Sequence, residues 1–258
     1  MVHVVLDAMG GDNAPKEIVK GALVALSDSK DICVTLCGRE DDIKAELEGK
    51  EYPKDRLFIE NATEVISTEE PPVMAIRRKK DSSIVRGMNL VKEGKADAFV
   101  SAGSSGAVLV GGQLIVGRIK GVERPPLAPL IPSTTERGVS LIIDCGANVD
   151  ARSSHLVQFA KMGSIYMEHV LGVKNPRVAI VNIGAEEEKG NMLVKETFPL
   201  LKNCPDINFI GSIGDVYKSI AAFFATIRPA LIPPISAIAS DATLSPSTRT
   251  SSNGNIFE

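Results

Sequence analysis

DCGANVD, at residues 144–150, follows an apolar run at residues 139–143 that predicts a buried strand. The seven residues bring two carboxylates, one amide and a glycine into what we expect to be a turn. Small polar residues at the carboxyl end of a parallel strand are where open α/β proteins hold ligands. The stretch therefore predicts a ligand-binding turn at the edge of a parallel sheet.

The same pattern of an apolar strand and a glycine-rich polar loop occurs three more times, at residues 6–12, 100–106 and 181–184. The carboxyl ends of parallel strands share one edge of a sheet, so we expect the four loops to surround one pocket. A shared polar pocket of this kind indicates an enzyme.

Apolar runs of strand length alternate with stretches of helical period up to about residue 213. Strands are expected at residues 2–6, 32–37, 57–59, 98–101, 127–131, 139–143, 178–182 and 207–210. Helices are expected at residues 15–27, 40–48, 82–93, 107–116, 156–170 and 192–201. This alternation predicts an α/β protein whose mostly parallel sheet is covered by helices on both faces.

Charge and hydropathy exclude several classes of protein. The net charge is −3 and the pI about 5.8, so no global basic field attracts nucleic acid. The basic run Arg77-Arg78-Lys79-Lys80 is interpreted as a solvated helix face. No apolar run reaches about 18 residues and no export signal opens the chain, so a cytoplasmic location is expected.

The metal-ligating residue types are scattered. Cys33, Cys37, Cys145 and Cys204 lack the spacing of a zinc site, and the first two favour a buried reduced pair. Asp7 and Asp12 have no histidine nearby, which argues against a metal there. Among the histidines only His155 is a candidate for catalysis.

Two of the polar loops have a chemistry that can be stated from their residues. Gly103-Ser104-Ser105-Gly106, between a strand and a helix, has the form of a phosphate cradle, although a structural turn would have the same composition. In residues 182–190 three carboxylates precede Lys189. This loop is either a solvated helix start or a site where the lysine pairs with phosphate or polarises a carbonyl.

Residues 214–258 differ from the rest, because Ser, Thr, Ala, Ile and Pro dominate and charged residues almost vanish. We expect an incomplete α/β domain at 1–213 and an atypical, poorly ordered tail at 214–258. An amphipathic membrane-surface element formed by residues 223–232 is the alternative for part of this tail.

Taken together, the chain resembles the PlsX family of phosphate acyltransferases over about residues 1 to 213. The motifs that carry the resemblance are residues 7–12, 75–83, 90–98 with 101–103, 123–125, 144–150, 158–164 and 182–190. The family usually has Ser-Ala-Gly-Asn-Thr-Gly where this chain has Ser101 to Gly106. The resemblance ends near Gly214, which leads to the hypothesis of a reading-frame change or truncation there.

The resemblance implies transfer of a long-chain fatty acyl group from acyl carrier protein to inorganic phosphate, giving acyl phosphate for phospholipid synthesis. It also implies a three-layer α/β/α fold related to phosphotransacetylases and isopropylmalate dehydrogenases, with no metal or nucleotide cofactor. The implied partners are acyl carrier protein and inorganic phosphate. The family further implies a homodimer, with a membrane or a glycerol-phosphate acyltransferase as an additional contact.

Under this hypothesis each polar loop has a role. The residues expected to take a catalytic part are Lys189, Asn182, Asn148 and Asp150. Those expected to bind substrate are Asp7, Gly10, Gly11, Ser101, Gly103, Ser104, Ser105, Gly106, Gly184 and Glu186. The serines and backbone N–H groups would seat phosphate, Lys189 or Asn182 would stabilise the oxyanion, and Asp7 would support the loops.

Two other functions are alternatives. A short-chain phosphotransacetylase would use coenzyme A thioesters in place of acyl carrier protein. A truncated, non-catalytic homologue would only bind acyl carrier protein or an acyltransferase partner. A dehydrogenase is disfavoured because the dinucleotide fingerprint is absent.

Overall fold

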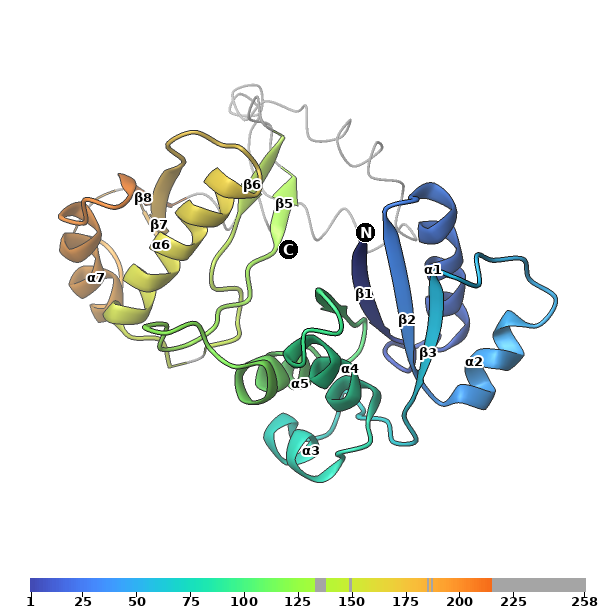
Figure 1. Cartoon of the computed structure of the whole chain (residues 1–258). Coiled ribbons are helices and arrows are strands. Elements are labelled where there is room, and N and C mark those ends of the chain that lie inside the picture. The colour runs from blue at the N-terminus through green and yellow to red at the C-terminus, as the bar shows by residue number, and fades with distance from the viewer. Residues whose placement is uncertain (133–137, 149, 185, 187, 215–258) are drawn as a thin grey trace, which may run out of the picture. The chain divides into compact units, whose positions relative to one another are not determined.

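The computed structural model describes residues 1–132, 138–148, 150–184, 186 and 188–214. The chain forms two compact units, Met1–Pro125 and Pro126–Glu258, and each is described by itself (Figure 1). The expected tail from residue 215 onward lies outside the described residues.

The first unit is built on a four-stranded parallel sheet with the order β3-β2-β1-β4. Its strands are β1 (Val2–Asp7), β2 (Ile32–Gly38), β3 (Leu57–Asn61) and β4 (Ala98–Val100). Its helices are α1 (Lys16–Asp28), α2 (Glu40–Leu47), α3 (Pro72–Arg78), α4 (Ser83–Lys92) and α5 (Ser105–Gly111), the last continued by a π-helical turn, η1 (Gly112–Val116). Strands and helices alternate in this unit as the sequence predicts.

Helices cover both faces of this sheet because its central strands are almost continuous apolar runs, with apolar side chains on both sides (Figure 1). Val34 and Leu36 of β2 pack in one core cluster with α1 and α2. Val5 of β1 and Cys37 of β2 lie in a second cluster, which includes Leu90 and Val91 of α4. The unit therefore has the three layers expected of the α/β/α class.

Serine side chains fix where two of the helices begin. Ser82 accepts a hydrogen bond from the Val85 N–H at 3.4 Å, and Ser104 accepts one from the Ala107 N–H at 3.2 Å. Each hydroxyl satisfies an N–H group that the first turn of a helix leaves unpaired. The second of these caps places the Gly103–Gly106 loop at the start of α5.

The second unit contains β5 (Leu130–Pro132), β6 (Val139–Leu141), β7 (Arg177–Val181) and β8 (Asn208–Ile213), with helices α6 (Ser153–His169) and α7 (Met192–Lys202). β7 and β8 pair in parallel. The core of the unit holds Ala160, Ile180, Phe198 and Leu201. The mostly parallel α/β class is therefore confirmed.

The strand before DCGANVD differs from the expectation. β6 pairs with β5 in an antiparallel manner, and Val139 and Leu141 are half-buried rather than buried. The run Ile142–Ile143 continues beyond the strand, with the Ile142 N–H bonded to the Pro129 carbonyl. An apolar run has the same composition in parallel and antiparallel pairings, so the prediction of a buried parallel strand here is wrong.

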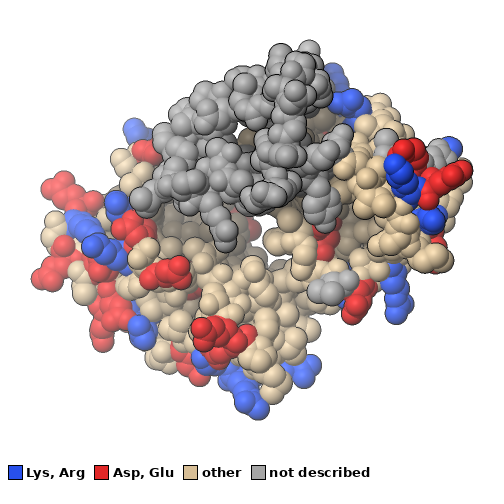
Figure 2. All heavy atoms as spheres, turned by 180° about the vertical axis from the view of Figure 1, so that it is seen from behind, with Lys and Arg blue, Asp and Glu red and all other residues tan. Residues whose placement is uncertain are grey.

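The basic run and the cysteines lie in the first unit largely as expected. Arg77 and Arg78 are exposed in the last turn of α3, although the helix itself is not predicted from the sequence. Cys37 is buried, Cys33 is half-buried, and both are free thiols. Acidic and basic side chains are interspersed on the face drawn in Figure 2. Within the described part of the chain, no helix is long and apolar enough to cross a membrane.

Candidate functional site

Asp7 and Ser101 lie together at the carboxyl edge of the first sheet. β1 and β4 pair in parallel with Leu6 opposite Val100, so the next residue of each strand emerges at the same edge. Asp7 is only 2% exposed, and its Oδ2 accepts a hydrogen bond from the Ser101 Oγ at 2.7 Å. Its other oxygen accepts the Met9 N–H at 3.1 Å. The buried carboxylate therefore joins two loops that are 94 residues apart.

The same contacts extend to the glycines of both loops. The Ser101 Oγ also accepts the Gly103 N–H at 3.0 Å. A Cβ atom on Gly10 would lie 2.5 Å from the Asp7 Oδ2 and 2.8 Å from the Gly103 nitrogen. Gly11 has a φ of +99°, a backbone conformation that favours glycine. The structure thus brings together five predicted site residues: Asp7, Gly10, Gly11, Ser101 and Gly103.

The loop at the start of α5 presents backbone donors. Ser104 is 5% exposed and its hydroxyl caps the helix, whereas Ser105 is exposed. Among the described residues, the N–H groups of Ser105 and Gly106 have no hydrogen-bond partner. Such N–H groups at a helix start attract anions. The donors that this loop could offer an anion are therefore backbone N–H groups, because the hydroxyls of Ser101 and Ser104 are already engaged.

In the second unit, Asn182 organises the loop that follows β7. It is 5% exposed, its Nδ2 donates to the Lys189 carbonyl at 2.9 Å, and its Oδ1 accepts the Ile183 N–H at 2.8 Å. Gly190 has a φ of +108°, and a Cβ there would lie 2.6 Å from the Asn182 Oδ1. The buried amide therefore closes the loop from residue 182 to residue 190.

Lys189 lies on the outside of this loop, paired with Glu186. Their Nζ and Oε1 atoms are 2.8 Å apart, and the two side chains are 50% and 63% exposed. The hydrogen bond from Lys189 holds the pKa of the Glu186 carboxyl below its usual range. A Cβ on Gly184 would lie 2.5 Å from the Lys189 Cδ, so the lysine stem passes over that glycine. Lys189, Asn182, Gly184 and Glu186 thus form one cluster.

Asp144 holds together the DCGANVD loop and was not among the predicted site residues. Its carboxylate accepts the N–H groups of Leu127 and Asn148 at 2.7 Å each, and that of Ala147 at 3.3 Å. The Asn148 side-chain amide also donates to it at 3.2 Å. Aspartate often bonds N–H groups of the residues that follow it in a turn, which is the sequence signal that could have identified it. Asp150 is exposed in the same loop.

His155 is buried in the second unit, with 4% of its surface exposed. Its Nδ1 accepts the Arg152 N–H at 3.2 Å at the start of α6, and its ring stacks on Phe159. This placement favours a structural role over the catalytic one.

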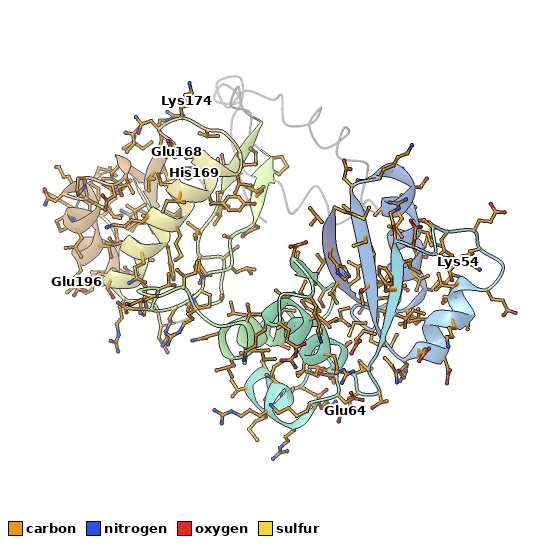
Figure 3. The ribbon with its side chains drawn as sticks, viewed as in Figure 1. Lys54, Glu64, Glu168, His169, Lys174 and Glu196 are labelled. Atoms are coloured by element: carbon orange, nitrogen blue, oxygen red, sulfur yellow. The ribbon has the colours of Figure 1, made fainter. Side chains whose placement is uncertain are left out.

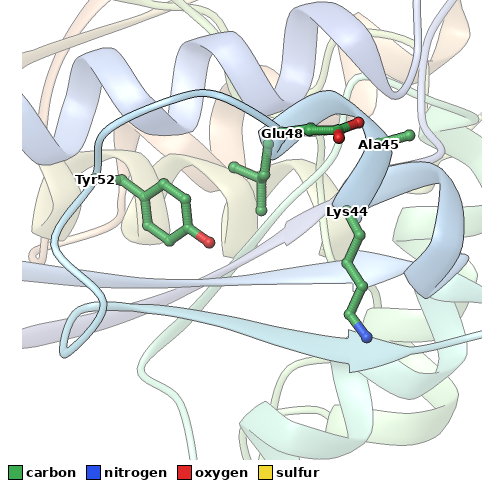
Figure 4. Close-up of a pocket in the computed structure, with 5 residues that line it drawn as sticks. Lys44, Ala45, Glu48 and Tyr52 are labelled. Atoms are coloured by element: carbon green, nitrogen blue, oxygen red, sulfur yellow. The ribbon is translucent and has the colours of Figure 1, made fainter.

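In the part of the chain that the structure describes, neither a metal site nor the hollow beside α2 coincides with these loops. Across the described ranges, no group of three or more His, Cys, Asp or Glu side chains is placed to hold a metal ion. A shallow hollow of about 370 Å³ lies beside α2 (Figure 4). Its lining residues are Lys44, Ala45, Leu47, Glu48 and Tyr52. The helix returns from the carboxyl end of β2 toward the start of β3, so this hollow lies away from Asp7.

Cys37, at the end of β2, has a thiol with an unusual pKa. Burial raises the pKa from 9.0 to about 12, and the nearby carboxylates of Glu60 and Asp7 act in the same direction. The unfolded thiol ionises near pH 9.0 and the folded one only near 12, so the thiol contributes stability below pH 9.0 that is lost as the pH rises toward about 12. We expect the urea midpoint to fall more steeply over this range in the parent than in Cys37→Ala. Cys145→Ala, at an exposed thiol, is the control, and equal slopes in all three proteins would contradict the assignment.

Two solved phosphotransacylases have a similar fold. A branched-chain phosphotransacylase from Enterococcus faecalis V583 matches with a TM-score of 0.51 and 13% identity, over 90% of this chain and 76% of that chain. The EutD phosphotransacetylase from Staphylococcus aureus matches with a TM-score of 0.56 and 18% identity, over 82% of this chain and 68% of that chain. These likenesses define the fold class as that of the phosphotransacylases.

Sequence comparison gives the family. A family profile described as "Fatty acid synthesis protein" matches residues 2–221. Proteins named phosphate acyltransferase from Clostridium botulinum (strain Alaska E43 / Type E3) and Clostridium tetani (strain Massachusetts / E88) are 54% and 52% identical, over 84% and 82% of this chain. The chain spans 64% and 63% of the length of these two curated relatives. The chain belongs to this fatty acid synthesis family, and the resemblance seen in the sequence is confirmed.

Proposed function

We propose that the protein transfers a long-chain fatty acyl group from acyl carrier protein to inorganic phosphate and forms an acyl phosphate. The observation that carries the proposal is the 52–54% identity to relatives named phosphate acyltransferase, over 82–84% of this chain. The two glycine-rich clusters, each fixed by a buried polar side chain, provide chemistry that suits this reaction.

In the first unit, phosphate would bind at the start of α5. The N–H groups of Ser105 and Gly106 point to this role, since they have no partner among the described residues. The exposed Ser105 hydroxyl is a further donor. Asp7 is buried and its carboxylate is bonded to Ser101 and Met9, so we assign it the positioning of the loop rather than contact with the anion.

In the second unit, Lys189 would neutralise developing negative charge. A phosphate oxygen attacks the thioester carbonyl carbon, the C–S bond breaks, and the proton of the phosphate passes to the departing thiolate. An ammonium group stabilises the carbonyl oxyanion formed on the way. Asn182 would hold the lysine loop in shape, and Asn148 with Asp150 would orient neighbouring groups.

The expected location, oligomeric state and further contacts of the protein also come from the family resemblance. We propose that the protein works in the cytoplasm as a homodimer, with a membrane or a glycerol-phosphate acyltransferase as a further contact.

A thiol-release assay tests the function. The chain is incubated with long-chain acyl carrier protein, and free thiol is measured with phosphate or with sulfate at equal ionic strength. We expect thiol release that requires phosphate, together with an acyl phosphate that hydroxylamine traps as the hydroxamate. Carrier binding without phosphate-dependent thiol release would contradict the proposal and favour a binding protein. Faster turnover of acetyl-coenzyme A than of the carrier substrate would favour a short-chain phosphotransacetylase.

A further inference from the structure

Helix α3 presents an exposed face that is half apolar and half basic. Val73 and Met74 are 44% and 42% exposed, while Ala75 and Ile76 on the other side of the helix are buried. Arg77 and Arg78 follow Val73 and Met74 at a spacing of four residues, which places each arginine one turn along from an exposed apolar side chain. We call Val73, Met74, Arg77 and Arg78 the α3 patch.

The charges of the α3 patch are not neutralised, whereas that of the neighbouring Lys79 is. Lys79 donates to the Glu70 Oε1 at 2.7 Å and to the Val65 carbonyl at 2.6 Å, and Lys80 donates to the Ile76 carbonyl at 3.3 Å. Within the described part of the chain, neither guanidinium of the patch has an ion pair or a hydrogen bond. Of the four-residue basic run, Lys79 is thus paired with a carboxylate, while both arginines are available to a partner.

Three other arginines of the first unit have partners within it. Arg39 pairs with Asp42 at 2.6 Å, and Arg86 pairs with Glu60. Arg56 donates to three backbone carbonyls, those of Leu26, Ser29 and Ile32. The two guanidinium groups of the α3 patch therefore differ from those of these three arginines, which have partners within the unit.

The α3 patch lies on a helix that packs against the proposed phosphate loop. A Cβ on Gly106 would lie 2.8 Å from the Pro72 Cγ, so the first residue of α3 touches the start of α5. Further along, a Cβ on Gly111 would lie 3.4 Å from the Ile76 Cδ1. α3 is thus held on α5 within one unit, and the two arginines of the patch lie about one and a half helical turns beyond the residue that contacts Gly106.

We propose that the α3 patch docks an acidic protein that carries the acyl thioester. This inference rests on the proposed function, because it assigns the surface that receives the donor. The whole chain has a net charge of −3, so an acidic partner is attracted only where basic charge is concentrated. Arginine and methionine are enriched at protein interfaces, and complementary charge sets the orientation and rate of docking.

A membrane fits the α3 patch less well than an acidic protein does. Binding to a lipid surface grows with buried apolar area, and α3 offers only two exposed apolar side chains in seven residues. Recognition of anionic lipid usually involves about four to eight clustered cations, whereas the patch has two and Lys79 beside it is already paired with Glu70. The patch has instead the size and composition of a small interaction centre on a protein interface.

Charge reversal of the α3 patch tests the proposal through binding. The full chain and its Arg77→Glu/Arg78→Glu variant are titrated with fluorescently labelled acyl carrier protein loaded with a long acyl chain, and anisotropy is recorded at two salt concentrations. We expect Kd to rise roughly tenfold or more in the variant, and its salt dependence to weaken. Arg77→Gln/Arg78→Gln, which introduces no carboxylates at the end of a helix, should show a smaller rise in the same direction.

The matched control is Lys30→Glu/Lys54→Glu, which makes the same change in charge. Lys30 and Lys54 are exposed and precede β2 and β3, so they lie at the edge of the sheet opposite Asp7; Lys54 is labelled in Figure 3. This variant should bind the carrier as the parent does. Equal binding by all variants, or no carrier binding by the parent, would overturn the proposal. So would a loss of binding to anionic phosphatidylglycerol vesicles with carrier binding unchanged.

Turnover of an acyl donor that contains no carrier protein distinguishes a failure of this inference from a failure of the proposed function. With long-chain acyl-coenzyme A, we expect the Arg77→Glu/Arg78→Glu variant to form acyl phosphate at the parent rate. If neither protein uses any donor but the reversal still weakens carrier binding, the docking surface stands and the catalytic proposal fails.

Discussion

Replacing Lys189 by alanine is expected to lower the rate of acyl-phosphate formation by about 10²–10³-fold. The ammonium group is the exposed cation of the loop after β7, and its stem is fixed by passage over Gly184. Loss of a charge that stabilises the transition state lowers kcat, whereas loss of a charge that only attracts phosphate raises KM. Measuring kcat and KM for phosphate separately, with hydroxamate trapping of the product, therefore identifies which role the lysine has.

Two further variants control this experiment. Lys195→Ala removes an exposed lysine from α7 in the same unit and should leave both constants unchanged. Glu186→Gln removes the carboxylate partner and keeps the ammonium, so its effect should be much smaller than that of Lys189→Ala. The Lys189–Glu186 pair is largely exposed, so the melting temperature should change little in any of these variants. Unchanged turnover in Lys189→Ala would remove this residue from the mechanism.

The fold class could be predicted because its causes are local. Strands buried on both faces, such as β2, are almost continuous apolar runs, and serines before α4 and α5 mark helix starts. The meeting of Asp7 with Ser101 also follows from a simple rule, since parallel neighbours end at the same edge.

Pairing direction and short elements could not be predicted. β6 is three residues long and antiparallel to β5, and nothing in its composition distinguishes this from a parallel partner. α3 is a seven-residue helix whose first residue is the second of two consecutive prolines, and it is too short to show a clear helical period. The direction of a strand pairing depends on distant residues, which a local pattern does not contain.

In the candidate site, the sequence indicates which residues take part more readily than it indicates their hydrogen-bond and ion-pair partners. Asn182 and Lys189 were both expected to act on substrate, but Asn182 is buried and bonded within its own loop. The bonds of Asp144 to the N–H groups of Ala147 and Asn148 are local and could be predicted, but its bond to Leu127, 17 residues earlier, depends on the path of a distant segment. Likewise, only the structure distinguishes Arg77 from Lys79, whose charge is neutralised by Glu70.

The second large effect is expected from Gly10→Ala. The added Cβ would lie 2.5 Å from the Asp7 Oδ2, 2.8 Å from the Gly103 nitrogen and 2.9 Å from the Ser101 Oγ. None of these atoms can move freely, since Asp7 is 2% exposed and the three groups are joined by hydrogen bonds at 2.7 and 3.0 Å. Overpacking of this kind costs about 1–3 kcal/mol of unfolding free energy. Displacing the loop that we propose positions phosphate should also lower turnover by up to about 10²-fold.

Gly21→Ala is the matched control for this substitution. Gly21 lies within α1, and a Cβ there would meet no atom within 4 Å. Alanine in a helix is more favourable than glycine by about 0.5–1 kcal/mol, so this variant should be slightly more stable than the parent and equally active. The urea midpoint should therefore shift in opposite directions for the two glycines, and only Gly10→Ala should lose activity in the phosphate-dependent assay. If Gly10→Ala matched the parent in both measurements, the close approach of the two loops around Asp7 would not determine activity, and the placement of the phosphate site beside them would lose its support.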